Sequence, residues 1–228
     1  MNAAIKPINA MSVDVEDYFQ VSAFERHIAR NQWDNLPHRV EQNTNRILDL
    51  FEQRQVKATF FTLGWVAERY PGLIHRIVAD GHELASHGYQ HTRVTEQTPD
   101  QFREDLRLSK NILEDISGQA VIGYRAASYS IGANNLWALE VLQEEGFVYS
   151  SSIYPVKHDL YGMPEAPRFA YRPANAPGLL EIPITTLNLF RRNIPCGGGG
   201  FFRLYPYSCS KWAYRYINNY EKQPGIFY

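Results

Sequence analysis

Cysteine is scarce in this sequence of 228 residues, which contains only Cys196 and Cys209. Two cysteines are too few for a disulfide scaffold, and these two lack the paired spacing of a structural zinc site. We therefore expect both to be free thiols.

An excess of charge of one sign is also missing. The sequence balances 23 lysines and arginines against 24 aspartates and glutamates, for a formal net charge of -1, and it shows no clustered basic stripe. Nucleic acids are bound through such basic surfaces. The composition therefore excludes nucleic acid as the main partner.

Long hydrophobic runs are the third absence. No stretch approaches the roughly 20 apolar residues that are needed to span a bilayer, and residues 1–7 contain no apolar signal-peptide core. The prediction is a protein without a transmembrane segment that is cytoplasmic by default. Peripheral association with a membrane face stays open.

Apolar and aromatic residues are plentiful, since 44% of the chain is hydrophobic and it contains 15 tyrosines and 12 phenylalanines. A chain of this length can bury one large core, and aromatic rings serve both such cores and sugar-stacking surfaces. We predict a single domain over residues 1–228, with a proline-rich cap at about 153–178 and a C-terminal segment at about 190–228.

Apolar segments of two kinds alternate along the chain, which predicts an α/β fold with a largely parallel sheet. Strands are expected at residues 8–13, 58–62, 82–85, 120–124, 147–149 and 179–184. Helices are expected at residues 40–53, 65–79, 98–116, 134–145 and 207–220. The glycines at 197–200 are expected to form a flexible turn, because no Lys-Ser/Thr pair follows them as in a phosphate-binding loop.

Two histidines four residues apart, His87 and His91, are the most informative feature of the sequence. Ser86 is a plausible helix N-cap, so the pair is expected on the loop and first helical turn after the strand at 82–85. A helical turn brings positions i and i+4 to one face. The carboxylates at 14–17 follow another strand, and two histidines with one carboxylate form a common catalytic metal set.

These residues lie in a series of motifs that resembles the polysaccharide deacetylases with a NodB homology domain, which are carbohydrate esterase 4-like proteins. Within them the sequence is similar to the subgroup associated with exopolysaccharide and exosortase (PEP-CTERM) gene clusters. The motifs that carry the resemblance are Ser12–Phe19, Phe61–Ala67, Gly81–His91, Gly123–Ser128 and Ser151–Pro155. Their order along nearly the whole chain makes the signal specific.

The resemblance implies a distorted (β/α) barrel that hydrolyses the N-acetyl amide of amino sugars in a polysaccharide or oligosaccharide. It implies a divalent metal, usually zinc, with cobalt or another divalent ion as alternatives. His87 and His91 match the metal-binding histidines, and Asp14 matches the general base. Arg125 matches an arginine that orients a catalytic carboxylate, and the backbone N–H near Ser128 matches an oxyanion donor.

The carboxylate that completes the metal site has two candidates. Many relatives carry two adjacent aspartates, whereas this chain has Val15 after Asp14. In an extended strand, residues i and i+2 share a face, which favours Glu16 over Asp17 as the partner of Asp14. Asp17 stays the alternative ligand.

The sequence departs from the family pattern at three places. Ala127 stands where proline is usual, and Ser150 stands where relatives tend to show an aspartate, for which Asp159 is a possible substitute. The family's last motif, which ends in a general-acid histidine, is expected to follow Tyr228. We therefore expect either a chain that lacks the C-terminal end of its barrel or a different proton donor.

Two other functions remain open on these grounds. One is a metal-binding carbohydrate-recognition protein with lost or weak turnover, as the departures at Ala127 and Ser150 suggest. The other is an amidase or deformylase acting on a lipid-linked or nucleotide-linked sugar, because the same catalytic set serves any small acyl amide.

Overall fold

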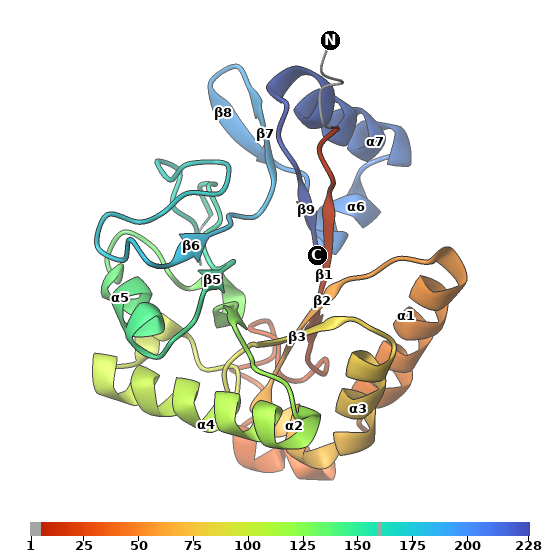
Figure 1. The fold of residues 1–228 in the computed structure, drawn as a ribbon, viewed down its shortest axis with the longest axis vertical. Helices are drawn as coiled ribbons and strands as arrows, with labels where there is room; N and C mark the ends of the chain where they lie inside the picture. Colours follow the sequence, from red (N-terminus) through yellow and green to blue (C-terminus); the bar gives the residue numbers. More distant parts are fainter. Residues whose placement is uncertain (1–5, 159–160) are drawn as a thin grey trace.

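A parallel β-sheet carries the fold (Figure 1). The computed structural model describes residues 6–158 and 161–228, and within these ranges seven strands pair in the order β6-β5-β4-β3-β2-β1-β9. Every pairing between neighbouring strands is parallel. The strands are β1 (Ala10–Val15), β2 (Thr59–Thr62), β3 (Glu83–Ser86), β4 (Gly123–Tyr124), β5 (Tyr149–Ser150), β6 (Leu180–Glu181) and β9 (Ile226–Phe227).

The register of the sheet aligns the carboxyl ends of six strands in one row. Each of these residues pairs with the next, in the order Val15, Thr62, Ser86, Tyr124, Ser150 and Glu181. The residues that directly follow the strands therefore meet at one edge of the sheet, where ligands of open α/β sheets bind. Glu16, His87 and Arg125 are among them.

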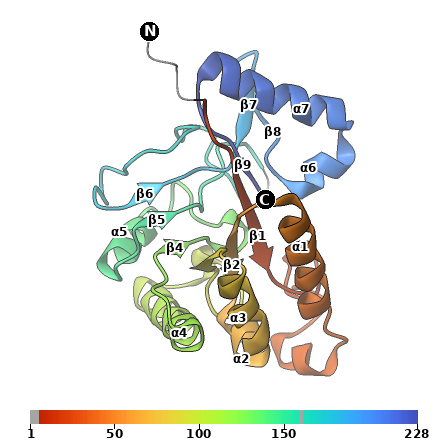
Figure 2. The ribbon, with the colours of Figure 1, turned by 45° about the vertical axis from the view of Figure 1, so that its right-hand side comes forward.

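Helices cover the sheet, and α1, α3 and α4 lie side by side along it (Figure 2). The α-helices are α1 (Val40–Arg54), α2 (Gly64–Arg69), α3 (Pro71–Ala79), α4 (Pro99–Ser117), α5 (Trp137–Glu144), α6 (Gly199–Leu204) and α7 (Tyr207–Tyr216). Shorter turns are η1 (Arg30–Asn35), η2 (Val94–Glu96), η3 (Ala127–Tyr129) and η4 (Ile217–Glu221).

Each long helix buries residues at helical spacing, as an amphipathic sequence requires. In α4 the buried residues are Phe102, Leu106, Ser109 and Leu113, and in α1 they are Val40, Thr44, Leu48 and Phe51. The main core lies between these faces and the sheet. Thr98 caps α4, because its hydroxyl accepts from the backbone N–H of Gln101 and the Gln101 side chain accepts from Thr98 N–H.

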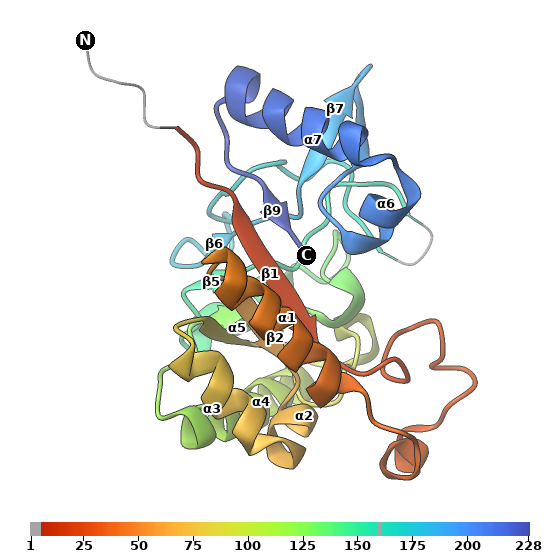
Figure 3. The same ribbon diagram turned by 90° about the vertical axis from the view of Figure 1, so that its right-hand side faces the viewer.

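The C-terminal part adds a small second unit of structure beside the sheet. Strands β7 (Thr186–Leu189) and β8 (Arg192–Pro195) form an antiparallel hairpin. A separate apolar cluster joins the hairpin to α7 and η4 through Leu187, Cys196, Ala213 and Ile217. After α7 the chain returns to the sheet as β9, which lies beside β1 (Figure 3).

The predicted α/β fold with a parallel sheet is confirmed, although several boundaries differ. Pro71 divides the expected helix at 65–79 into α2 and α3, because a proline within a helix removes a backbone hydrogen bond. The expected strands at 120–124 and 179–184 shrink to two residues each. The glycine segment at 197–200 is only partly a turn, since its last two glycines begin α6.

Both cysteines are free, as predicted, and Cys196 is buried whereas Cys209 is exposed. Among the described helices, none combines the length and the apolar character that crossing a membrane requires. Asp159, expected as a possible partner of Arg125, lies outside the described residues.

Candidate metal and catalytic site

Glu16, His87 and His91 converge at the carboxyl edge of the sheet. One ligand atom from each of the three side chains lies within 4.8 Å of the other two. Glu16 follows β1, and both histidines follow β3, so two strands that are not neighbours supply the set. Two imidazoles and one carboxylate match the donor set of catalytic zinc and related divalent-metal sites.

The orientation of these groups fits a cation between them. The Nε2 atom of His91 lies 2.9 Å from Glu16 Oε2, so an imidazole nitrogen and a buried carboxylate oxygen point at one another. A buried carboxylate needs a compensating charge or hydrogen bond. A metal ion shared by the carboxylate and the two imidazoles would supply it when bound.

His87 is fixed by a contact on its other side. Its Nδ1 lies 2.8 Å from the carbonyl oxygen of Arg125. Because a carbonyl only accepts, Nδ1 carries the proton and Nε2 keeps its lone pair for a ligand. Such carbonyl contacts orient metal-binding histidines. The backbone of Arg125 therefore supports the site as well as its side chain.

Charges around the site are tightly balanced. Burial lowers the pKa of His87, which favours the neutral form that binds metal. For His91, burial lowers the pKa whereas the carboxylates of Glu16 and Asp14 raise it, and the carboxylates outweigh burial, so the pKa is raised. The protonated form of His91 is therefore stabilised by these nearby negative charges.

The loop that carries the histidines differs from the expected helical turn. Ser86 ends β3 and caps no helix, and residues 87–93 contain no helix. Gly88 has φ +78° and His91 has φ +54°, values that interrupt a right-handed helix. The carbonyls of Gly88 and Tyr89 instead accept from the first N–H groups of α2, at 2.9 and 3.0 Å. The two rings still meet, with centroids 5.2 Å apart, through this tethered loop.

Asp14 and Arg125 form a buried ion pair beside the three candidate ligands. Arg125 Nη1 donates to Asp14 Oδ1 at 2.6 Å, and the arginine side chain is only 1% exposed. Burial raises the pKa of Asp14, but the guanidinium outweighs it, so the pKa lies below its usual value. Asp14 is therefore a carboxylate at neutral pH, the state that accepts a proton.

A cavity of about 320 Å³ opens over these groups, and Ser128 and Tyr129 form part of its wall. Both residues have positive φ, +53° and +51°, as His91 does. Such backbone is strained for non-glycine residues and gathers at functional sites. The Ser128 hydroxyl contacts that of Ser22. The left-handed turn at 128–129 follows Ala127, which is buried at 1% exposed and stands where the family usually has proline.

Asp17, the alternative ligand, is occupied elsewhere. Its Oδ2 accepts from the backbone N–H groups of Arg39 and Val40 at 2.6 and 2.9 Å, and its Oδ1 accepts from Tyr18 N–H at 2.8 Å. These contacts cap the first turn of α1 from a distant part of the chain. The three-residue cluster with metal-binding geometry contains Glu16 and not Asp17.

Replacing Asp17 by alanine is expected to destabilise the fold without removing the metal site. Three backbone N–H groups would lose their acceptor, which costs roughly 2–3 kcal/mol in total when part of the site rehydrates. Denaturant unfolding of Asp17→Ala should show a lower midpoint, while titration still finds one bound divalent cation. Glu16→Gln should behave in the opposite way. A stable Asp17→Ala protein that no longer binds metal would make Asp17 the ligand.

Asp105 of α4 clamps the histidine loop and predicts a pH effect on stability. Both of its carboxylate oxygens accept from Tyr89 N–H, at 3.2 and 3.3 Å, and a side chain at Gly88 would clash with it. Burial raises the pKa of Asp105 from 3.8 to about 6. Because the folded pKa is the higher one, its stabilising contribution is full below about pH 4 and is lost as the pH rises through about 6.

Asp105→Asn removes this titration. Relative to the wild type, its free energy of unfolding should therefore improve by up to roughly 3 kcal/mol between about pH 4 and about pH 7. Urea titrations at several pH values measure the difference, with Asp115→Asn, at an exposed position of the same helix, as the control. A difference that does not vary with pH would contradict the assigned shift.

The sequence did not indicate every residue of the site. Tyr129, Tyr161 and Tyr228 line the cavity, and their rings form edge contacts with one another at centroid distances of 5.0 Å for Tyr129–Tyr228 and 6.0 Å for Tyr129–Tyr161. They come from segments far apart in the chain, and no motif joins them. Their only sequence signal is the high tyrosine content.

Comparison with known families gives two matches that together cover most of the chain. A family model described as polysaccharide deacetylase matches residues 26–149, and a domain of unknown function, DUF3473, matches residues 151–228. The first match contains the histidine loop and Arg125. The second contains β6, the hairpin, α6, α7 and β9.

Curated relatives match less than half of the chain. The chain is 37% identical over 98 residues to a peptidoglycan-N-acetylglucosamine deacetylase of Bacillus cereus, which is 42% of this chain and 36% of that protein. It is 31% identical over 99 residues to a chitooligosaccharide deacetylase of a Bradyrhizobium species, or 43% of each chain. The aligned part is thus less than half the length of these relatives.

Among solved structures, a putative polysaccharide deacetylase from Mycobacterium smegmatis aligns with all of this chain and 77% of its own, with a TM-score of 0.69 and 21% identity. A protein from Bacillus anthracis described as a CE4 family pseudoenzyme aligns with 99% of this chain and 56% of its own, with a TM-score of 0.54 and 12% identity. At these identities the likeness concerns the fold alone.

Proposed function

Because the chain belongs to the polysaccharide deacetylase family, we propose that it is a metal-dependent hydrolase that removes N-acetyl groups from amino sugars of a polysaccharide. The observation that carries the proposal is the convergence of Glu16, His87 and His91 next to the Asp14–Arg125 pair. The names of the matched relatives, which are deacetylases of peptidoglycan and of chitooligosaccharides, support this substrate class.

In this proposal, Glu16, His87 and His91 hold a divalent cation, with zinc as the expected ion and cobalt or another divalent ion as alternatives. When bound there, such a cation polarises the amide carbonyl and lowers the pKa of water. Zn²⁺ accepts this mixture of nitrogen and oxygen ligands.

Asp14 accepts the proton of the attacking water. Its depressed pKa keeps it ionised, and its Oδ1 is held by Arg125, so that the other oxygen is free to face the cavity. The backbone N–H near Ser128 is the proposed donor to the oxygen that gains charge in the transition state. The tyrosines of the cavity wall exclude water and pack against the sugar.

The finer assignment rests on the sequence motifs. We propose that the polysaccharide belongs to exopolysaccharide biosynthesis, in line with the resemblance of segments such as Ser151–Pro155 to that subgroup.

Acetate release tests the function. The purified protein, loaded with one equivalent of Zn²⁺ or Co²⁺, is incubated with acetylated amino-sugar oligomers and with their de-N-acetylated forms as the blank. Release that requires the metal and disappears with a chelator is expected. If the protein binds one equivalent of metal but releases no acetate, the alternative of a carbohydrate-recognition protein with lost turnover is favoured. The fold is compatible with either function.

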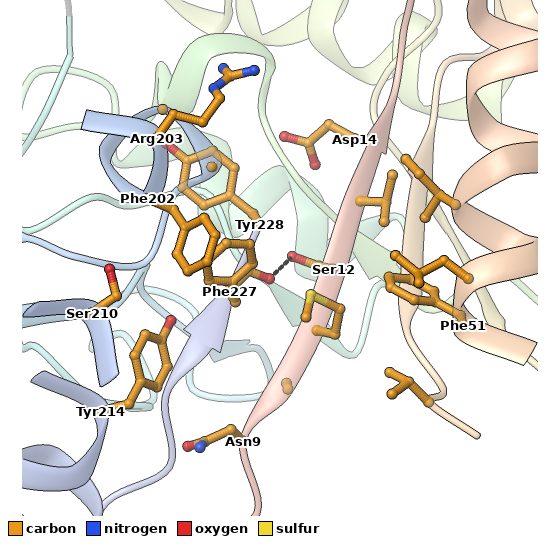
Figure 4. Close-up of a pocket in the computed structure, with 18 of the residues that line it drawn as sticks. Asn9, Ser12, Asp14, Phe51, Phe202, Arg203, Ser210, Tyr214, Phe227 and Tyr228 are labelled. Carbon is orange, nitrogen blue, oxygen red and sulfur yellow. Dashed lines mark hydrogen bonds between the residues drawn. The ribbon is translucent and has the colours of Figure 1, made fainter. Parts of the chain in front are cut away.

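A second candidate substrate is a sugar attached to a lipid phosphate, and a large groove favours it. The groove, of about 1010 Å³, runs between α1 and α7 and shares Asp14, Glu16 and Tyr228 with the site cavity (Figure 4). Its apolar lining includes Met11, Leu50, Phe51, Phe202 and Phe227, and its basic side chains are Lys57, Arg203, Lys211 and Arg215. An apolar floor with basic groups suits a lipid chain and its phosphate.

This candidate predicts a preference that is measured by comparing the same N-acylated sugar with and without a prenyl-phosphate group. A higher kcat/KM for the lipid-linked form, lowered by Lys211→Glu, supports it. Equal values for the two forms would leave the polysaccharide as the substrate.

A further inference from the structure

We propose that Glu181 is a positioning residue for Arg125, which it holds through the turn at Ser150–Ile153 so that the guanidinium can orient Asp14. The proposal rests on the proposed function for its effect on turnover. Its structural content concerns the arginine alone, and it can be tested without any reaction.

The contacts of Glu181 fix the turn. The side chain is fully buried at the end of β6, and its Oε1 accepts from the backbone N–H groups of Ser152 and Ile153 at 2.9 and 2.8 Å. A carboxylate that receives two backbone N–H groups holds them more strongly than a neutral acceptor does. The main chain after β5 is therefore tied to the neighbouring strand by this one side chain.

The turn at Ser150–Ile153 holds the side chain of Arg125. The carbonyl oxygen of Ser151 accepts from Arg125 Nε at 3.2 Å, and its hydroxyl accepts from Nη2 at 3.1 Å. The hydroxyl of Ser152 accepts from Ala126 N–H at 2.9 Å, which ties the backbone next to the arginine to the same turn. With these donors engaged, Nη1 is directed to Asp14 at 2.6 Å.

Burial and charge bear on the same assignment. Arg125 is fully buried and forms an ion pair with Asp14. Burial raises the pKa of Glu181 to about 6, and the hydrogen bonds from Ser150, Ile153 and Ser152 oppose that rise more than the attraction of Arg125 does. The backbone N–H groups of the turn are therefore the main compensation for this buried carboxylate, which ties the turn to Glu181.

The register of the sheet explains why Glu181 could not be identified from the sequence. Relatives tend to show an aspartate at position 150, where this chain has serine. Ser150 pairs with Tyr124 on one side and with Glu181 on the other. The carboxylate therefore stands one strand farther along the same row, 31 positions later in the sequence, where no motif for Arg125 would be sought.

The test uses Glu181→Gln, which keeps an oxygen for the two N–H groups and removes the charge. The first readout is the hydrogen-exchange rate of the Arg125 Nε–H, followed by NMR in arginine-labelled protein and assigned with Arg125→Lys. The second is kcat and KM for acetate release by the metal-loaded protein. Glu145→Gln is the matched control, because Glu145 is a largely buried carboxylate that pairs with Arg103 and Arg107 away from the site.

We expect Glu181→Gln to accelerate exchange at Arg125 and to lower kcat roughly 10- to 100-fold, the range that loss of an orienting partner produces, with KM within about twofold of the wild type. Bound metal should stay at one equivalent, and Glu145→Gln should change neither readout. Glu181→Asp, which restores the charge, should recover part of kcat.

Unchanged exchange at Arg125 in both Glu181→Gln and Glu181→Asp would overturn the proposal, whatever the activity. A fall in kcat that only follows the fraction of unfolded protein would overturn it as well. If the wild type releases no acetate, the proposed function fails, but the exchange of the Arg125 Nε–H still decides the role of Glu181. Should Glu181→Gln not fold, Glu181→Asp alone gives this reading: it keeps the charge but its shorter side chain weakens the contact with the turn, so exchange at Arg125 should be faster than in the wild type.

Discussion

Replacing His87 by alanine is expected to abolish tight binding of a divalent cation and, with it, the release of acetate. The imidazole is 2% exposed and its Nδ1 is held by the Arg125 carbonyl, so its Nε2 is fixed in position for a ligand. Changes in the residues that merely orient a ligand lower metal affinity by roughly 10- to 100-fold, and the loss of the ligand itself should exceed that range.

Calorimetric titration of the metal-free protein with Zn²⁺ or Co²⁺ measures the effect. His75→Ala is the control, because His75 is exposed on α3, outside the cluster. We expect His87→Ala to unfold at a temperature close to that of the metal-free wild type. A variant that still binds one equivalent with undiminished affinity would show that the three-residue cluster is not the metal site.

The positions of the candidate ligands along the sheet could be predicted from the sequence. Apolar runs before Asp14, His87 and Arg125 indicated buried strands, and parallel strands bring their carboxyl ends to a common edge. The structure has these strands in one parallel sheet, with β2 between the first two and their carboxyl ends in one row. The position of each candidate residue at a strand end could be predicted from local sequence, because the strand and the residue after it are continuous in the chain.

The conformation of the histidine loop could not be predicted in the same way. The spacing of His87 and His91 suggested a helical turn, whereas the loop is shaped by carbonyl contacts to α2 and by Asp105 of α4. These partners lie more than fifteen positions away in the sequence, and a histidine with positive φ leaves no sequence signal. Spacing alone predicted the proximity of the rings but not its cause.

Glu16 and Asp17 show how a buried carboxylate is assigned by its partners. The alternation of a strand favoured Glu16 but left Asp17 open. The decisive difference is that Asp17 accepts three backbone N–H groups, two of them from the start of α1, more than twenty positions away. The choice of Glu16 as ligand remains a proposal that the opposed effects of Asp17→Ala and Glu16→Gln on stability and metal binding can test.

The second large effect is expected from Asp14→Asn, which should lower kcat about 10²- to 10⁴-fold while one equivalent of metal remains bound. Asparagine keeps the oxygen that accepts from Arg125 Nη1, so the position of the side chain is preserved. It cannot accept the proton of water at neutral pH. Acetate release and metal titration on the same preparation separate the loss of the base from the loss of the site.

The stability of this variant provides an independent check. The pKa of Asp14 is depressed in the folded protein, so its charge stabilises the fold above about pH 4, and the contribution is lost as the pH falls through the lower, folded pKa. Asp14→Asn should therefore be less stable than the wild type at neutral pH, because Arg125 loses its buried counter-charge, and the difference should shrink in acid. Asp34→Asn, which alters a largely exposed aspartate paired with Arg69, should change neither kcat nor this pH dependence. Full activity in Asp14→Asn would assign the base to another group, whereas lost metal together with lost activity would place Asp14 among the ligands.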